Sequence, residues 1–254
     1  AKGTVERLLI NSPHFPEDIA LKKGAIHWRQ DKINLENCNF SFLDITGQLF
    51  LNVALKEQKV SSVALSLKTE IKEKVQEWLF QKCSLPEAFK LQTPSKVRSL
   101  RLEWGKRDFT RLSTKINAPS GKILQLELKF NKKGMEVDKL LLQDKISKAL
   151  FAANWNKSKL SCTFNGGLYK KTLDGILKEN NFLQGKILGG NLELVADLEN
   201  PILSSIKGKL KAAGVLVPLS LDSEKFIDLK SLVLEGNEEG LFLQKADAEF
   251  EGNF

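Results

Sequence analysis

The amino-acid sequence predicts a mainly β protein, a long curled antiparallel sheet (a β-groove) with two or three short amphipathic helices. The first observation is a recurring pattern in which a glycine precedes a segment with an apolar residue at every second position. Clear copies begin at Gly47, Gly121 and Gly190, and a looser copy begins at Gly208. Successive side chains of a strand point to opposite faces, so each copy has one apolar and one polar face. Strands of this kind joined by tight turns form a wide antiparallel sheet.

The second observation is a composition typical of one folded domain. The chain has 254 residues, of which 42% are hydrophobic and 28% charged, and no run of about 18 apolar residues occurs. Because no linker rich in proline or glycine interrupts it, we expect a single domain over residues 1–254. The chain begins at Ala1 and ends in strand-like sequence, so we expect it to be a segment of a longer protein.

The first part of the chain predicts a β-meander followed by a helix. The expected strands are Ala25–Trp28, Lys32–Leu35, Phe40–Ile45, Gln48–Leu55 and Val60–Leu67. The period then changes over residues 69–79, where Ile71, Val75, Trp78 and Leu79 form one helical stripe. Thr69 is the expected cap of this helix, and Pro86 limits its length.

The remaining sequence repeats this arrangement. Further strands are expected at Phe89–Gln92, Ser99–Trp104, Phe109–Ile116, Lys122–Phe130, Met135–Leu142 and Lys159–Phe164, whereas residues 144–152 fit either a strand or a helix. Tyr169, Leu173, Ile176 and Leu177 repeat the spacing of the first helix. Strands continue from Leu183 to Phe250, with a short helix beginning at Pro201. Two internal repeats, about 20–140 and 141–254, are therefore possible interpretations of the pattern.

The charge pattern has two interpretations. Lysine and arginine together number 39 against 31 acidic residues, a net charge of +8, and the lysines are scattered through the expected strands. They either hydrate the outer face and protect the sheet edges or attract an anionic surface. Nucleic acid is not an expected partner, because arginines are few and no base-stacking motif occurs.

Motifs that carry enzyme chemistry are absent from the sequence. The only histidines, His14 and His27, have no cysteine or aspartate at ligand spacing, so we expect no metal. No Gly-x-Ser-x-Gly or phosphate-binding loop occurs, and Asn165-Gly166 is expected to form a tight turn. The abundant carboxylates leave a glycoside hydrolase conceivable, but surface carboxylates that balance lysines are the simpler interpretation. We therefore expect a non-enzymatic protein without a cofactor.

The cysteines and the aromatic residues each allow two interpretations. Cys38, Cys83 and Cys162 are expected to be small buried hydrophobic residues, although one disulfide and one free thiol would also fit. Fifteen phenylalanines and four tryptophans accompany a single tyrosine. Because phenylalanine has no polar tip, these side chains fill a closed core or line an apolar trough.

Several segments resemble the AsmA-like family of cell-envelope proteins, which includes TamB and is related to bridge-type lipid-transfer proteins. The resemblance covers most of residues 20–254 and is carried by structural signatures at turns and helix starts. These signatures are Leu91–Pro94, Leu100–Trp104, Leu140–Asp144, Phe164–Leu168, Thr172–Leu177, Gly185–Gly190, Asp197–Pro201 and Gly208–Leu210. The family has no catalytic residues to transfer.

The resemblance implies a segment that binds and transfers lipids without enzymatic activity. Its expected partners are a phospholipid or another acyl lipid, the inner membrane through an N-terminal anchor outside this sequence, and outer-membrane proteins. The expected location is the periplasm, and transport would run between the inner and outer membranes. The alternative is a structural or interaction protein that holds no lipid, either a closed β-sandwich or a scaffold that assists outer-membrane assembly.

The physical argument for a lipid groove is the cost of exposing acyl chains to water. Each methylene costs roughly 0.8 kcal/mol, so two chains cost on the order of 20 kcal/mol. A curled sheet of about 12 to 16 strands, roughly 60 to 75 Å long, would offer the chains a continuous apolar surface. The apolar positions of the recurring pattern are the expected lining: Leu49, Leu51, Val53, Leu55, Leu124, Leu126, Leu128, Phe130, Leu192, Leu194, Ala196, Leu198, Leu232 and Leu234.

Overall fold

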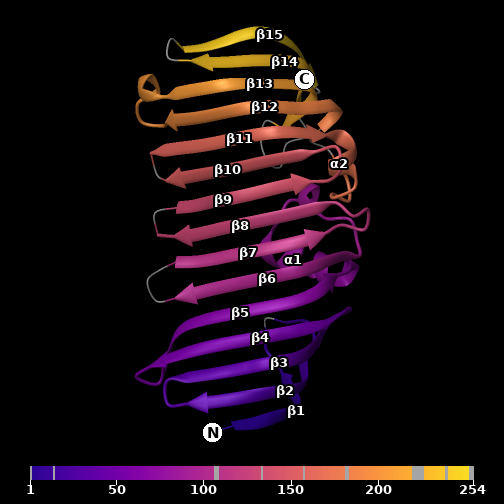
Figure 1. Ribbon diagram of the computed structural model, residues 1–254, viewed down its shortest axis with the longest axis vertical. Coiled ribbons are helices and arrows are strands. Elements are labelled where there is room, and N and C mark those ends of the chain that lie inside the picture. The colour runs from indigo at the N-terminus through magenta and orange to yellow at the C-terminus, as the bar shows by residue number, and fades with distance from the viewer. Residues whose placement is uncertain are drawn as a thin grey trace.

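The computed structural model describes residues 2–13, 15–105, 109–132, 134–156, 158–180, 183–218, 226–237 and 240–251. Its strands form a single antiparallel sheet in which β1 to β15 pair in sequence order (Figure 1). The predicted fold class, a mainly β curled antiparallel sheet with few short helices, is confirmed. The strands are β1 Lys2–Ile10, β2 Ile19–Arg29, β3 Lys32–Phe42, β4 Ile45–Lys56, β5 Lys59–Ile71, β6 Ser95–Gly105, β7 Phe109–Asn117, β8 Ile123–Asn131, β9 Gly134–Gln143, β10 Lys148–Asn156, β11 Lys159–Tyr169, β12 Leu183–Asp197, β13 Ser205–Pro218, β14 Phe226–Asn237 and β15 Gly240–Glu251.

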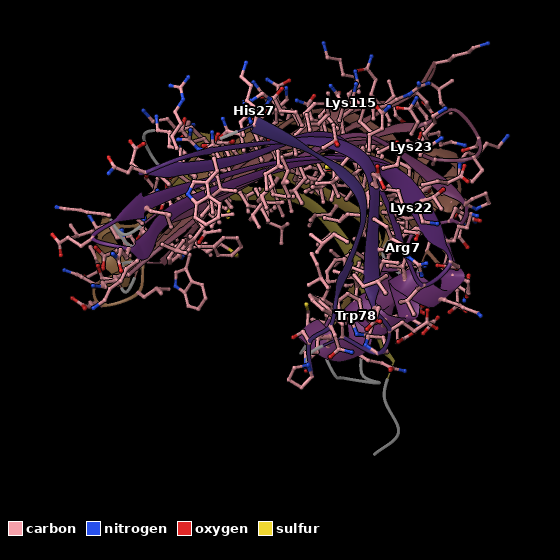
Figure 2. All side chains as sticks on the ribbon, turned by 90° about the horizontal axis from the view of Figure 1, so that it is seen from below. Arg7, Lys22, Lys23, His27, Trp78 and Lys115 are labelled. Atoms are coloured by element: carbon pink, nitrogen blue, oxygen red, sulfur yellow. The ribbon has the colours of Figure 1, made fainter. Side chains whose placement is uncertain are left out.

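The sheet is curled across its width into an arch. Figure 2, which looks along the long axis, places His27 and Lys115 on the convex side and Trp78 at the end of one arm. Side chains adjacent in sequence to His27 and Lys115 therefore face the concave side. With fourteen strand-to-strand intervals of about 4.8 Å, the arch is roughly 67 Å long.

Glycines in the strands allow neighbouring backbones to approach closely where the sheet bends. Gly166 in β11 pairs with Gly190 in β12, and both have positive φ angles, 114° and 136°. A Cβ atom at Gly166 would lie 1.9 Å from the carbonyl oxygen of Lys148, which excludes any other residue. The tight turn expected at Asn165-Gly166 is therefore wrong, because both residues lie inside a strand.

The first helix, α1 (Glu73–Cys83), begins four residues later than the predicted cap. Thr69 is instead in β5, paired with Gly47 and Val97, and its hydroxyl donates to the carbonyl of Thr46. The cap comes from a distant turn, where the Asp44 carboxylate accepts the backbone N–H groups of Lys74 and Val75 at 2.9 and 3.1 Å. Sheet pairing through Thr69 therefore overrides the local capping signal.

Other element boundaries also differ from the prediction. The expected strand Phe40–Ile45 is the end of β3, a turn, and the first residue of β4. The expected strand Phe89–Gln92 is the end of the 3₁₀ helix η1 (Glu87–Phe89) and a single bridge from Leu91 to Leu177. The second helix, α2, is shorter than expected and spans only Lys170–Asp174, while the short helix predicted at Pro201 is present as η2 (Pro201–Leu203).

Two apolar clusters fasten the helices to one long side of the arch. In the first, Val75 of α1 packs with Leu21, Cys38 and Phe42 of the sheet, and Trp78 makes an edge-to-face contact with Phe42 at 5.1 Å. In the second, α2 and the segment after it pack on strands β9 to β12. The buried members of this cluster are Ala118, Leu142, Ala149, Phe164, Leu168, Leu173, Ile176, Leu177 and Leu183.

The segments that carry α1 and α2 are joined to each other, although they are about one hundred residues apart. The backbone N–H of Gln92 donates to Ile176, and that of Lys178 donates to Lys90, at 2.8 and 2.7 Å. The Lys178 ammonium also lies 2.6 Å from the Glu73 carboxylate. These contacts form a continuous border along one side of the arch, which we call the helix rim. The predicted internal repeats, with one helix after β5 and one after β11, stay a prediction.

Replacement of the distant cap tests how α1 is held. Asp44→Ala removes the acceptor for two N–H groups and should lower the free energy of unfolding by about 1 kcal/mol. Urea denaturation measures the change. Asp31→Ala, in the exposed β2–β3 turn, is the control and should stay within about 0.5 kcal/mol of the wild type. Equal effects of the two substitutions would contradict the capping role.

The Glu73–Lys178 pair predicts a specific pH dependence. Hydrogen bonds from Lys178 and Thr93 lower the pKa of Glu73 from its ordinary value of 4.5. The stabilisation is therefore present above pH 4.5 and is lost as the pH falls through the lowered pKa. Glu73→Gln should unfold more easily than the wild type at pH 7 and as easily in strong acid. A difference in thermal midpoint that persists unchanged in acid would contradict this assignment.

Candidate functional site

The candidate site is the concave face of the arch, where strand pairing aligns apolar side chains into rows that run from strand to strand. The central row crosses twelve strands, β2 to β13, with no polar member. Its residues are Ile26, Leu35, Leu51, Leu65, Leu102, Leu112, Leu128, Val137, Ala153, Cys162, Leu194 and Ile206. We call this set the central row.

The central row is accessible to solvent. Only Leu35 is buried, at 7% exposure, and the other members are half-buried. The residues that the structure describes form one sheet, so no second sheet covers this face, and the closed β-sandwich of the alternative prediction is not what these residues form. A water-exposed apolar surface this long is unusual in a monomeric protein and indicates a binding surface.

A second row lies nearer the strand ends that face away from α1 and α2. From β2 to β12 it contains Trp28, Ile33, Val53, Val63, Trp104, Thr110, Phe130, Met135, Trp155, Leu160 and Ala196. Its largest members are exposed, with Trp28 and Trp155 both at 55% and Trp104 at 43%. We call this side of the arch, where the row and the adjoining turns lie, the free rim.

All fourteen residues predicted from the sequence occupy the concave face. On β4, β8 and β12 they span the width of the groove, from Leu124 at the helix rim to Leu198 at the free rim. Leu49 and Leu51 pack against the α1 cluster, and Leu124 and Leu192 pack against the α2 cluster, so these four also stabilise the fold. Leu126, Leu128 and Phe130 belong to the part of the face farther from the helices.

A distinct hollow of about 360 Å³ indents the concave face near the free rim. Its size falls within the range of small-molecule sites, roughly 300 to 1,000 Å³. Six apolar residues line it: Met135, Val137, Ala153, Trp155, Leu160 and Leu198. Of these, the sequence predicted only Leu198.

The predicted set missed the tryptophans of the free rim. Each of Trp28, Trp104 and Trp155 is the last apolar residue of an alternating strand, just before a turn. Their sequence signal is the alternation itself, as in Ile26-His27-Trp28, followed within four residues by lysine or arginine. The recurring pattern that begins with glycine does not include β2, β6 or β10, so a search based on glycine passes over them.

The convex face is polar along the corresponding positions. The row that contains His27 continues through Asn34, Asn52, Ala64, Glu103, Arg111 and Lys129, and Ala64 is its one apolar member as far as β8. Ion pairs such as Lys129 with Asp138, at 2.8 Å, lie on this convex face. The two faces thus differ in polarity along most of the arch, with hydrated ions outside and hydrocarbon inside (Figure 2).

The most concentrated buried polar cluster has a structural role. The Thr172 hydroxyl, fully buried, donates to Asp144 at 2.8 Å and lies 2.6 Å from the hydroxyl of Ser147. Burial opposes ionisation of Asp144, but hydrogen bonds from Ile146, Thr172 and Ser147 outweigh it and lower the pKa of this carboxyl. The cluster fastens α2 to the β9–β10 turn.

The cysteines match the prediction only in part, and the potential metal ligands are described with them here. All three cysteines are free; Cys38 is buried and Cys162 half-buried, but Cys83, expected to be buried, is exposed near the end of α1. In the described part of the chain, no group of three or more potential ligands could hold a metal ion. His27 lies on the convex face, and His14 falls outside the described residues.

Comparisons with known proteins leave the resemblance to the AsmA-like family untested. Within the described ranges, no helix has the length and apolar character needed to cross a membrane. No family model, no curated protein and no solved structure matches the chain.

Proposed function

We propose that the concave face binds the acyl chains of phospholipids and shields them from water during transfer. The observation that carries this proposal is the central row, twelve consecutive strands without a polar side chain, almost all of it half-exposed. A single aromatic pocket would suit one small ligand. A continuous apolar surface about 53 Å long, eleven strand-to-strand intervals of about 4.8 Å, suits several long, flexible hydrocarbon chains.

The energetics of the groove favour chains that can move along it. Each methylene transferred from water to an apolar surface gains roughly 0.8 kcal/mol, and contact with one side of the chain gains a fraction of that. Because the row has similar residues at every strand, no position is a deep energy minimum. The groove is therefore suited to hold a lipid and to let it pass to the next strand.

The wider biological setting follows from the resemblance to AsmA-like proteins. We propose that the chain is part of a periplasmic conduit between inner and outer membranes, anchored at the inner membrane, without a cofactor or a catalytic step. Outer-membrane proteins are proposed partners. A scaffold that aids outer-membrane assembly without carrying lipid is the alternative outcome of the experiments below.

A pair of charges in the groove tests lipid binding. Leu126→Asp with Leu128→Asp places two carboxylates in neighbouring rows of β8, where ionised groups oppose contact with hydrocarbon. Native mass spectrometry after gentle isolation should find lipid on the wild type and less than about one-tenth of that amount on the variant.

The matched control adds the same charge to the convex face. Gln48→Asp with Asn52→Asp on β4, both exposed, should leave the lipid content unchanged. Circular dichroism checks that both variants keep the sheet. Wild-type protein without lipid, or equal lipid on the two variants, would contradict the proposal and favour the scaffold.

A neutral substitution tests the hollow near the free rim. Ala153→Trp inserts a large apolar side chain at a half-buried central-row position that lines this hollow. If acyl chains occupy the hollow, the variant should hold fewer lipids per molecule without becoming more polar. Ala64→Trp on the convex face of β5 is the control. Equal lipid-to-protein ratios in both variants would exclude the hollow as a binding position.

A further inference from the structure

The free rim has a regular line of exposed tryptophans. Three of the four tryptophans of the chain lie there, on β2, β6 and β10, at intervals of four strands. The interval corresponds to about 19 Å, so the line from Trp28 to Trp155 extends about 38 Å. Phe130 and Met135, both 39% exposed, lie between Trp104 and Trp155 in the same row.

Exposed cations accompany these tryptophans in the turns of the free rim. Arg29 and Lys32 flank the β2–β3 turn, and Lys56 and Lys59 flank the β4–β5 turn. Lys132 lies in the β8–β9 turn and Lys159 begins β11. Lys159 lies 3.7 Å from Asp197, the acidic residues of the first two turns are Asp31 and Glu57, and Glu199 lies in the β12–β13 turn. The described turns of this rim therefore have an excess of positive charge.

The helix rim also contains charged residues, several of which are paired. Lys90 contacts Glu77 and Glu87 at 2.6 and 2.5 Å, and Lys178 contacts Glu73. Lys72, Lys82 and Lys145 add exposed positive charge there as well. Exposed apolar residues such as Leu85 and Phe89 occur there too, at 46% and 47%. The two rims therefore share exposed apolar residues and exposed cations, and what sets the free rim apart is its line of exposed tryptophans.

We infer that the free rim docks on the surface of an anionic phospholipid bilayer. Tryptophan prefers the boundary between hydrocarbon and headgroups because its ring is apolar and its N–H can donate a hydrogen bond. Lysine and arginine beside it attract anionic headgroups. A line about 38 Å long matches an extended, flat partner better than one small ligand. Docking here places the free rim of the groove beside the lipids it would take up.

Vesicle binding tests this inference independently of lipid uptake by the groove. The probe is vesicles of phosphatidylcholine with about one-third phosphatidylglycerol. Trp28→Ser, Trp104→Ser and Trp155→Ser combined should weaken sedimentation with these vesicles at least tenfold. Leu85→Ser with Phe89→Ser on the helix rim is the matched control and should bind like the wild type.

The charge contribution is tested by neutralising cations without touching the tryptophans. Arg29→Gln, Lys56→Gln and Lys59→Gln should each weaken binding about fivefold, and added salt should weaken binding of the wild type. Circular dichroism verifies that the variants are folded. These single substitutions on exposed turn residues also keep the test valid if the triple tryptophan variant unfolds.

The outcomes separate this inference from the proposed function. Vesicle binding weakened in the cation variants, whose substituted residues lie outside the groove lining, with groove lipid retained by mass spectrometry, supports docking through this rim. The inference is overturned if the wild type does not bind anionic vesicles, if the helix-rim variant loses binding instead, or if the cation variants bind normally. A wild type that binds vesicles but contains no groove lipid would overturn the proposed function and leave docking intact.

Discussion

The register of the antiparallel pairing is the constraint on which the rest of the structure depends. Leu102, Leu112 and Leu128 form part of one apolar row only because each lies directly opposite the next. A slip of one residue between two strands would move every leucine of a strand to the convex face. The register is secured at the helix rim, where Leu142 and Ala149 are buried opposite each other beneath the α2 segment. Local irregularities, such as the shift between Glu127 and Leu128, add curl without exchanging the faces.

This arrangement separates stability from binding across the width of the sheet. Side chains near the helix rim are buried and pack α1 and α2 against the strands. Backbone hydrogen bonds, such as that from Gln92 to Ile176, join the two helix segments along this border. Side chains farther across the same strands are half-exposed, and the largest of those at the free rim are exposed. A short helix is sufficient to bury one end of each apolar stripe, and the other end stays available to a ligand.

The fold class and the apolar face could be predicted from the sequence, because the alternation of apolar and polar residues along a strand is a local property. The leucines of β4, β8 and β12 identify both the fold class and the apolar face. Long-range effects could not be predicted. Thr69 has the sequence signal of a helix cap, but it lies in strand β5 of the sheet. Asp44, in a turn distant in sequence, caps α1 instead. Tyr169 has the helical spacing of a buried residue, but it is the last residue of strand β11, before α2 begins, and it is 39% exposed. The tryptophan line appears only when the strands are placed side by side.

The most direct measurement is photo-crosslinking of the native protein at adjacent positions of β8, whose side chains point to opposite faces. A photoreactive phenylalanine derivative replaces Leu128 in one sample and Glu127 in another, and mass spectrometry of irradiated cells identifies the adducts. The account predicts lipid adducts at position 128 and none above background at position 127. Adducts of equal yield at both positions, or no lipid adduct at position 128, would contradict the claim that the concave face is a path for hydrocarbon.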